Sequence, residues 1–423
     1  MIDDSPLLST GYILLVAGLA TYALLAFRSV RRSRLPYPPG PSPLPFLGNI
    51  KQIPQEKQAL GYMHLAKEYG DIYHLSTLGN HIIVLSSSTH VDELLVKRSI
   101  NSSDRSRMPM LNELMGWDFA FGVMPYGERW KNHRKLFDAW FRPSQVTSNW
   151  QQTQSDCAHS LLVNLLHSPD NFKIHIHRTV TTLITRVMYG FHIGDEHEHF
   201  VSITEKALNG FKVASTPGKY LVDTIPILKY VPSWFPGASF KRRAVEWKKL
   251  TYAMINLPFN LALSSIAEGK ASRCFVADHI NDSEESNLEG IDITTIPGTD
   301  TLVSTFMSFF LAMTLHPEAQ RAAQEELDRV CRGRLPEFSD RASLPYIDAL
   351  CIEVGRWASI APFALPHTTT HDDIYDGYLI PAGAIIMANV WYGSPSHPSL
   401  RETLTIDPGR SHTMRRRIRS LTN

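Results

Sequence analysis

The hydrophobic pattern of the chain begins with an uncharged stretch from Leu7 to Phe27, which contains 21 residues. A helix of this length spans about 30 Å, the thickness of the hydrocarbon core of a bilayer. Acidic residues precede the stretch, and four arginines follow it between positions 28 and 34. Cytosolic flanks are rich in basic residues, and a signal peptide carries its basic residues before the apolar stretch. We therefore predict one transmembrane helix at 7–27, with residues 1–6 in the lumen.

A proline-rich segment follows the apolar stretch. Six of the residues from Leu35 to Pro45 are proline. Proline lacks the backbone N–H that helices and sheets require, so this density favours a stiff, extended spacer. We assign residues 28–48 to a basic, proline-rich hinge.

Helical periodicity dominates the middle of the chain, and strand-like patterns lie near its two ends. The expected helices are 61–69, 91–96, 130–137, 151–166, 180–189, 240–256, 302–315, 318–330 and 347–358, and the expected strands are 71–75, 81–85, 374–380 and 384–390. No repeat and no clear linker divides residues 50–400. The pattern predicts a mainly α-helical domain with a small β-sheet region over residues 49–391.

Composition and charge exclude several classes of protein. A net charge of +1 provides no overall field for nucleic acid, and the arginine cluster at positions 415–419 is typical of a solvated end. The four cysteines are scattered and form no CxxC pair. This spacing argues against a disulfide framework and against a structural zinc site, and it fits a reducing compartment.

A metal hydrolase remains a competing interpretation at this point. His175, His177 and the segment Asp195–His199 contain side chains of the types that bind metal ions. No motif places a third ligand beside them, and such a run is usually a solvated loop. A serine hydrolase has less support, because the chain contains no GxSxG motif.

Two motifs place chemically useful side chains at helical spacing. Trp130 and Arg134 are four residues apart, so an indole N–H and a guanidinium share one helix face and can meet one carboxylate. Glu353 and Arg356 are three residues apart and can form an ion pair on one face.

A third motif, Gly298–Thr301, precedes an apolar helical run. An acid and a hydroxyl at Asp300 and Thr301 can relay protons, and they suit a helix N-cap equally well. Pro297 stands directly before the motif, so we expect that a helix does not easily continue through this position.

Six segments occur in the order found in the cytochrome P-450 superfamily. They are Pro38–Pro41, Tyr126–Arg134, Gly298–Thr301, Glu353–Arg356, Ala361–His367 and Tyr378–Ala384. Over residues 7–391 the chain resembles the fungal microsomal members that act on secondary metabolites. The resemblance implies the cytochrome P-450 fold and a haem-dependent monooxygenase, an oxidoreductase that oxidises an apolar substrate such as a terpenoid or a polycycle.

The resemblance also implies roles for the matching residues. The side chains expected to contact haem propionates are Trp130, Arg134, His367 and Arg105. Asp300 and Thr301 are expected to supply the protons that dioxygen activation consumes. Glu353 and Arg356 are expected to brace the core beside the haem. The side chains expected to contact substrate are Phe119, Phe121 and Phe363.

The partners that the resemblance implies are a membrane, a reductase and a small molecule. Electrons would come from NADPH through a membrane-bound reductase. The protein would be a single-pass protein of the endoplasmic reticulum membrane with a cytosolic catalytic domain. Its substrate would be small and apolar, and we expect no nucleic-acid partner.

The chain departs from the family near its C-terminal end. The family's haem ligand is a cysteine in an FxxGxRxC loop, several dozen residues after the motif that matches Glu353–Arg356. The thiolate of this cysteine favours O–O cleavage. The 67 residues after Arg356 include no cysteine, and from about Tyr392 the resemblance ends, which makes 392–423 a divergent tail. Our hypothesis is that this change reflects a frameshift, a mis-joined exon or a truncated gene product. We expect the chain as written to be inactive. The alternative is a haem-free, membrane-anchored protein that binds apolar ligands or partners without catalysis.

Overall fold

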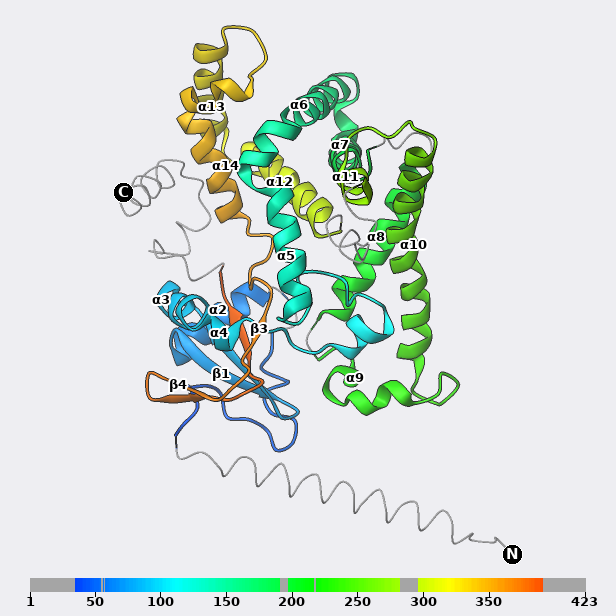
Figure 1. The fold of residues 1–423 in the computed structure, drawn as a ribbon. Helices are drawn as coiled ribbons and strands as arrows, with labels where there is room; N and C mark the ends of the chain where they lie inside the picture. The colour runs from blue at the N-terminus through cyan, green and yellow to red at the C-terminus, as the bar shows by residue number, and fades with distance from the viewer. Residues whose placement is uncertain are drawn as a thin grey trace, which may run out of the picture. The chain divides into compact units, whose positions relative to one another are not determined.

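The computed structural model describes residues 35–390, apart from positions 55, 57, 191–196, 217 and 282–295. The chain forms two compact units (Figure 1). Unit 1 comprises Met1–Asp104 and Pro366–Asn389, and unit 2 comprises Arg105–Leu365 and Val390–Asn423. The predicted transmembrane helix and the divergent tail lie outside the described residues, so both stay predictions.

Unit 1 is built around a sheet with the strand order β1-β2-β6-β3. Its strands are β1 (Ile72–Thr77), β2 (Asn80–Leu85), β6 (Ile385–Ala388) and β3 (His367–Thr368). The β1–β2 hairpin is antiparallel, whereas β2 and β6 are parallel, so the blue early strands and the orange late strands of Figure 1 share one unit. The strands expected at 71–75 and 81–85 are confirmed.

Short helices complete unit 1. They are α2 (Gln58–Tyr69), α3 (Ser88–Val91), the π-helix η1 (Asp92–Lys97) and α4 (Ser99–Ser102). The sheet buries Ile83, Leu85 and Ile386 against Leu94 of η1. Alternate apolar positions of the strands thus supply the core of this unit.

A second hairpin in unit 1 corrects one prediction. The pattern predicted a single strand over 374–380, but the structure divides it into β4 (Asp373–Tyr375) and β5 (Tyr378–Ile380). Asp376 and Gly377 form the turn, with φ angles of 52° and 78°. Two-residue hairpin turns of this kind need positive φ at both central positions, and Asp-Gly suits them. The apolar residues on both sides of the turn read as one continuous strand in the sequence.

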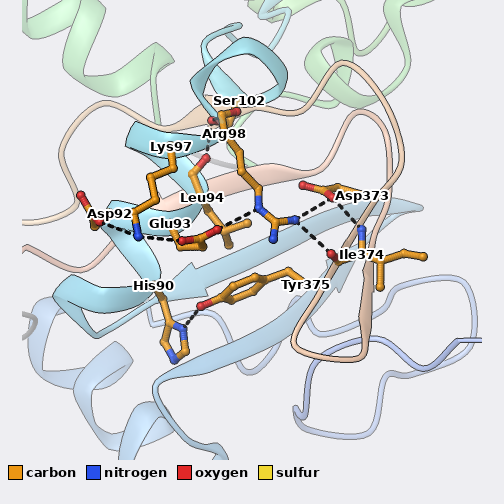
Figure 2. A network of polar contacts seen from close by, with 10 residues as sticks. All are labelled: His90, Asp92, Glu93, Leu94, Lys97, Arg98, Ser102, Asp373, Ile374 and Tyr375. Atoms are coloured by element: carbon orange, nitrogen blue, oxygen red, sulfur yellow. Dashed lines mark hydrogen bonds and ion pairs between the residues drawn. The ribbon is translucent and has the colours of Figure 1, made fainter.

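Polar contacts join this hairpin to the helical segment of unit 1 (Figure 2). The Arg98 guanidinium donates to Asp373 at 2.9 Å and to the Ile374 carbonyl at 3.0 Å, and it lies 5.2 Å from the centroid of the Tyr375 ring. The Tyr375 hydroxyl is 2.7 Å from Nδ1 of His90. These contacts hold the early and late parts of unit 1 together.

Unit 2 is almost entirely helical. Its α-helices are α5 (Glu128–Phe141), α6 (Pro143–His167), α7 (Phe172–Tyr189), α8 (His197–Ala214), α9 (Leu221–Thr224), α10 (Ser239–Ala267), α11 (Phe275–Asn281), α12 (Ile296–Leu315), α13 (Pro317–Cys331) and α14 (Pro345–Trp357). Its shorter helices are η2 (Pro109–Leu114), η3 (Pro169–Asn171), η4 (Pro226–Tyr230) and η6 (Phe338–Ser343). Proline opens α6, α13 and α14, where its missing N–H costs nothing. The prediction of a mainly α-helical protein with a small sheet is confirmed.

The longest helix, α10, extends beyond its predicted end at 256. It continues through Pro258 because Met254, Ile255, Pro258 and Ala262 all face the interior of unit 2. Burial of this stripe outweighs the hydrogen bond that proline removes. By length and composition, α10 is also the one described helix that could cross a membrane. Its buried stripe packs inside unit 2, and the rest of the helix is partly or fully exposed.

Candidate functional site

The Glu353–Arg356 pair lies on α14 in the geometry that its spacing predicts. Arg356 Nε donates to one carboxylate oxygen of Glu353 at 2.9 Å, and Nη2 donates to the other at 2.7 Å. Glu353 is fully buried, and 18% of the Arg356 side chain is exposed. A buried ion pair stabilises a fold little more than a pair of well-packed apolar residues would. Loss of one partner is costly, however, because it leaves the other charge buried and unpaired. The pair therefore neutralises a buried carboxylate within α14 itself.

The start of α14 is fixed by a second buried acid. Glu326 of α13 accepts the backbone N–H of Tyr346 at 3.2 Å and that of Ile347 at 3.0 Å. These N–H groups belong to the first turn and have no partner within the helix. A carboxylate at a helix N-terminus also interacts favourably with the helix dipole. Sequence reasoning did not identify Glu326, because the contact joins two helices.

Trp130 lies on α5 beside a substrate-contact candidate. Its ring stacks on Phe121 with centroids 5.1 Å apart and an interplanar angle of 9°, and Tyr126 lies 5.4 Å away. Stacked aromatic pairs of this kind add to the energy of burial. The structure thus brings together two residues to which the sequence assigned different roles.

Arg134 lies one turn further along α5 and pairs with Asp138 at 3.1 Å. About half of the Arg134 side chain is exposed, at 51%. An exposed pair at this spacing contributes only about 0.3–0.5 kcal/mol. The guanidinium can therefore turn to another acid at little cost.

In unit 2, Arg105 and the loop after Phe121 both lie against the 361–365 segment. Arg105 Nη1 donates to the Leu365 carbonyl at 2.5 Å. A Cβ added at Gly122 would lie 2.7 Å from Cδ1 of Leu365, so the loop that follows Phe121 runs close beside the 361–365 segment. Phe363 is half-buried in that segment. His367 lies in β3 of unit 1, opposite Ile386 of β6.

The acid and the hydroxyl of the third motif occupy the first turns of α12. The helix begins at Ile296, directly before Pro297, so proline lies in the first turn, where it is tolerated. Thr301 is exposed, and its carbonyl accepts the Thr305 hydroxyl at 2.8 Å. The side chain of Asp300 lies outside the described residues. Its part in a proton relay stays a prediction.

Two buried polar side chains escaped the sequence analysis. Trp117 is fully buried, stacks on Phe119 at 5.6 Å and meets Phe211 edge-on at 4.8 Å. Its indole N–H and the hydroxyl of Tyr220, which is 9% exposed, have no hydrogen-bond partner among the described residues. A buried polar group without a partner costs about 1–3 kcal/mol. Both residues belong to one apolar cluster, which we call the η2–α10 cluster.

The η2–α10 cluster joins η2 and the loop after it to α8 and α10. Its buried members are Met110, Leu111, Met115, Trp117, Phe119, Ala120, Val123, Met124, Ala207, Ala214, Tyr220, Val222, Ala244, Met254 and Ile255. Asp223 lies beside it and accepts the Met110 N–H at 2.9 Å. Burial raises the pKa of this carboxyl to about 6. Periodicity could not reveal Asp223, because its contact joins two short helices, α9 and η2.

The donor types fit the haem that the resemblance implies only in part. Indole and guanidinium donors such as Trp130 and Arg134 suit propionates. Cys157, Cys274 and Cys331 are buried, and Cys351 lies on α14 itself. Burial raises the pKa of the Cys157 and Cys274 thiols, which disfavours the thiolate that binds iron. The cysteines of this chain therefore do not fit as the axial ligand.

Among the described residues, the histidines that favoured a metal hydrolase have other polar partners. No group of three potential metal ligands occurs among the described residues. His175 contacts Ser168 at 2.9 Å, and His177 lies 3.8 Å from Glu205. Positions 195 and 196 lie outside the described part of the chain.

Comparison with known proteins agrees with the order of motifs. A sequence model of the family described as Cytochrome P450 matches residues 38–394. The cytochrome P450 monooxygenase COX2 of Coprinopsis cinerea is 40% identical over 387 residues, which cover 89% of this chain and 73% of the relative. The tryptamine 4-monooxygenase of Psilocybe cyanescens is 36% identical over 390 residues, which cover 89% of this chain and 76% of that relative. The chain belongs to the cytochrome P450 family, as a monooxygenase-like member related to fungal monooxygenases.

Proposed function

We propose that this chain holds the substrate-binding part of a fungal monooxygenase that acts on a small apolar secondary metabolite. The observation that supports this most is the η2–α10 cluster, a packed group of buried apolar side chains that includes two donors without partners among the described residues, on Trp117 and Tyr220. A ligand that entered between these side chains would meet mostly apolar surface and one or two donors, which suits a terpenoid or an aromatic polycycle with one or two acceptor atoms. One relative is named for its action on tryptamine, a compound with an aromatic ring system.

The residues expected to hold haem keep their proposed roles in a form of the protein that supplies a thiolate. In unit 2, Trp130, Arg134 and Arg105 would bind propionates by charge-assisted hydrogen bonds. His367, in unit 1, is a propionate candidate through its motif alone. Bound haem would supply dioxygen activation. Glu353 and Arg356 would keep α14 in place. In that form Asp300 and Thr301 are the candidates for proton delivery.

The chain as written is proposed to lack monooxygenase activity, because none of its four cysteines fits as the axial ligand. The alternative is a haem-free protein that binds apolar ligands without catalysis. A chimera of residues 1–390 with the C-terminal quarter of the Coprinopsis relative tests the first proposal. With a fungal reductase and NADPH, the chimera should oxidise apolar compounds, and the 423-residue chain should not. A folded, haem-loaded chimera without any such activity would contradict the proposed function.

A reductase partner is supported by the charge of α5. Besides Arg134, which is assigned to a propionate, the basic side chains of this helix are Arg129, Lys131, His133 and Lys135. Arg129 and Lys131 form exposed ion pairs with Asp118 and Glu128, which contribute little and can be exchanged for acidic groups of a partner. Reductase binding should therefore weaken as ionic strength rises. Binding that is insensitive to salt would count against this surface.

A membrane location is supported by two parts of the chain. The uncharged stretch Leu7–Phe27 is long enough to span a bilayer. In unit 2, Ile227, Tyr230 and Trp234 are 71%, 73% and 77% exposed. Trp and Tyr are enriched at membrane interfaces. We place the protein in the endoplasmic reticulum membrane with its catalytic part in the cytosol. Release by alkaline carbonate would contradict an integral anchor.

A further inference from the structure

Three aromatic rings from two separate segments form a stack in unit 1. The Tyr37 ring lies 4.8 Å from the His74 ring, at an interplanar angle of 23°, and 4.9 Å from the His81 ring. Nε2 of His74 is 2.9 Å from Nδ1 of His81. The register of the β1–β2 hairpin pairs His81 with Ser76, so the two histidines are diagonal neighbours on one face.

Backbone hydrogen bonds hold the segment of Tyr37 against the same unit. The Pro36 carbonyl accepts the Leu379 N–H at 2.8 Å, and the Pro39 carbonyl accepts the His74 N–H at 2.8 Å. The Pro41 carbonyl accepts from the Asn49 amide at 2.9 Å. Residues 36–41 of the predicted hinge are therefore docked on the strands.

The surroundings of the stack disfavour a positive charge on His74 and His81. Two imidazoles at hydrogen-bond distance share one proton and cannot both be cations. Burial, and then the neighbouring His81, lower the pKa of His74 to about 4, and burial lowers the pKa of His81. Burial and the nearby Asp372 raise the pKa of Tyr37. Among the described residues, the titratable groups that act on this stack are Tyr37, His74, His81 and Asp372.

We propose that the stack of Tyr37 on His74 and His81 is an acid-released joint, which docks residues 36–41 on unit 1 at neutral pH and releases them when the histidines take up protons. A histidine whose pKa is lower in the docked state binds fewer protons there. Docking is therefore strongest above the ordinary histidine pKa of about 6.5 and weakens as pH falls from there toward about 4. Residues 36–41 therefore become loosely attached to the strands of unit 1 under acid conditions.

Hydrogen exchange at two amides tests the joint in the full chain held in detergent micelles. The Leu379 and His74 N–H groups donate to the docked segment, so their protection reports docking. After correction for intrinsic exchange rates, protection at both amides should fall about 30-fold from pH 7.5 to pH 5.0. This figure counts only the proton that His74 takes up. The Asn389 N–H, which donates to Leu85 within unit 1, should keep its protection at both pH values.

Matched variants separate protonation from packing. The double variant His74→Phe/His81→Phe keeps the rings but cannot take up protons, so its protection should be the same at both pH values. Tyr37→Ala should lose protection at both. Three results would overturn the joint: an unchanged wild type, an equal acid loss in the double-Phe variant, or a parallel loss at Asn389.

Ring chemical shifts of the wild type test the joint even where the double variant does not fold. His74 should be neutral at pH 7.5 and should take up its proton over the pH range in which Leu379 loses protection. Protonation without loss of protection would also contradict the proposal.

Discussion

The guanidinium of Arg98 and the carboxylate of Asp373 are 2.9 Å apart, although 275 positions separate them in the chain. This ion pair connects the helical segment before α4 to the β4–β5 hairpin (Figure 2). Both partners are partly buried, at 32% and 23% exposed, so solvent screens the pair only in part. The Arg98 side chain therefore adds to the β2–β6 pairing that joins the early and late segments of unit 1.

Arg98→Ala should lower the free energy of unfolding of unit 1 by about 1–2 kcal/mol, because it removes hydrogen bonds to Asp373 and to the Ile374 carbonyl. Lys97→Ala is the matched control. The Lys97 side chain is 62% exposed, so loss of its ion pairs should change the free energy of unfolding by at most about 0.5 kcal/mol. Urea denaturation followed by circular dichroism measures both. An effect of Lys97→Ala as large as that of Arg98→Ala would contradict this account.

Arg356→Ala should destabilise unit 2 far more, by about 3–5 kcal/mol, because it leaves the buried Glu353 carboxylate without its charged partner. Arg341→Ala is the control. Arg341 pairs with Asp348 of α14, and 70% of the Arg341 side chain is exposed. Thermal unfolding should separate the two variants by several degrees. The double variant Glu353→Gln/Arg356→Met should recover part of the loss, and a double variant as unstable as Arg356→Ala would count against a charge effect.

Tyr220→Phe should have opposite effects on stability and on ligand binding. The variant removes a buried hydroxyl that has no partner among the described residues, so the ligand-free protein should gain up to about 1 kcal/mol. A ligand that accepts a hydrogen bond from this hydroxyl should bind about 5- to 10-fold more weakly. Tyr230→Phe, at a position that is 73% exposed, should change neither. Tryptophan fluorescence titrations with apolar aromatic compounds measure the binding, and equal affinities would remove Tyr220 from the site.

Asp223 should make stability depend on pH. Its folded-state pKa of about 6 lies above the ordinary 3.8, so the folded state binds the extra proton. The stabilising contribution of this proton is present below about 4 and is lost as pH rises through about 6. Asp223→Asn keeps an acceptor for the Met110 N–H and removes the titration. The variant should be more stable than wild type at pH 7.5 by about 1–2 kcal/mol, and the difference should shrink toward pH 4. Parallel stability profiles would show that Asp223 is not buried as described.

The sequence predicted the parts of the fold that depend on local spacing. The helix of Glu353 and Arg356 was expected at 347–358 and spans Pro345–Trp357, because apolar periodicity and proline mark its start. The hairpin turn at Asp376-Gly377 was missed, although its residue types are favourable, because apolar residues flank it on both sides. Helix α8 (His197–Ala214) was also missed.

The candidate site was less predictable for a physical reason. Trp117 and Tyr220 lie in loops and Asp223 in the short α9, and all three are covered where these segments meet longer helices; no periodicity within one helix records such a meeting. The stacking of Trp130 on Phe121 likewise joins a helix to a loop. Motif spacing indicated which residue types carry chemistry, but not which of them share a surface.

The carbon monoxide difference spectrum of dithionite-reduced membranes that contain the 423-residue chain reports whether a cysteine of this chain binds haem iron. We expect no Soret band of the thiolate-ligated type from this chain, because its cysteines are buried or lie on α14. The chimera that supplies an FxxGxRxC loop should show that band under the same conditions. A thiolate-type band from the 423-residue chain itself would contradict the account, since one of its four cysteines would then have to bind the iron.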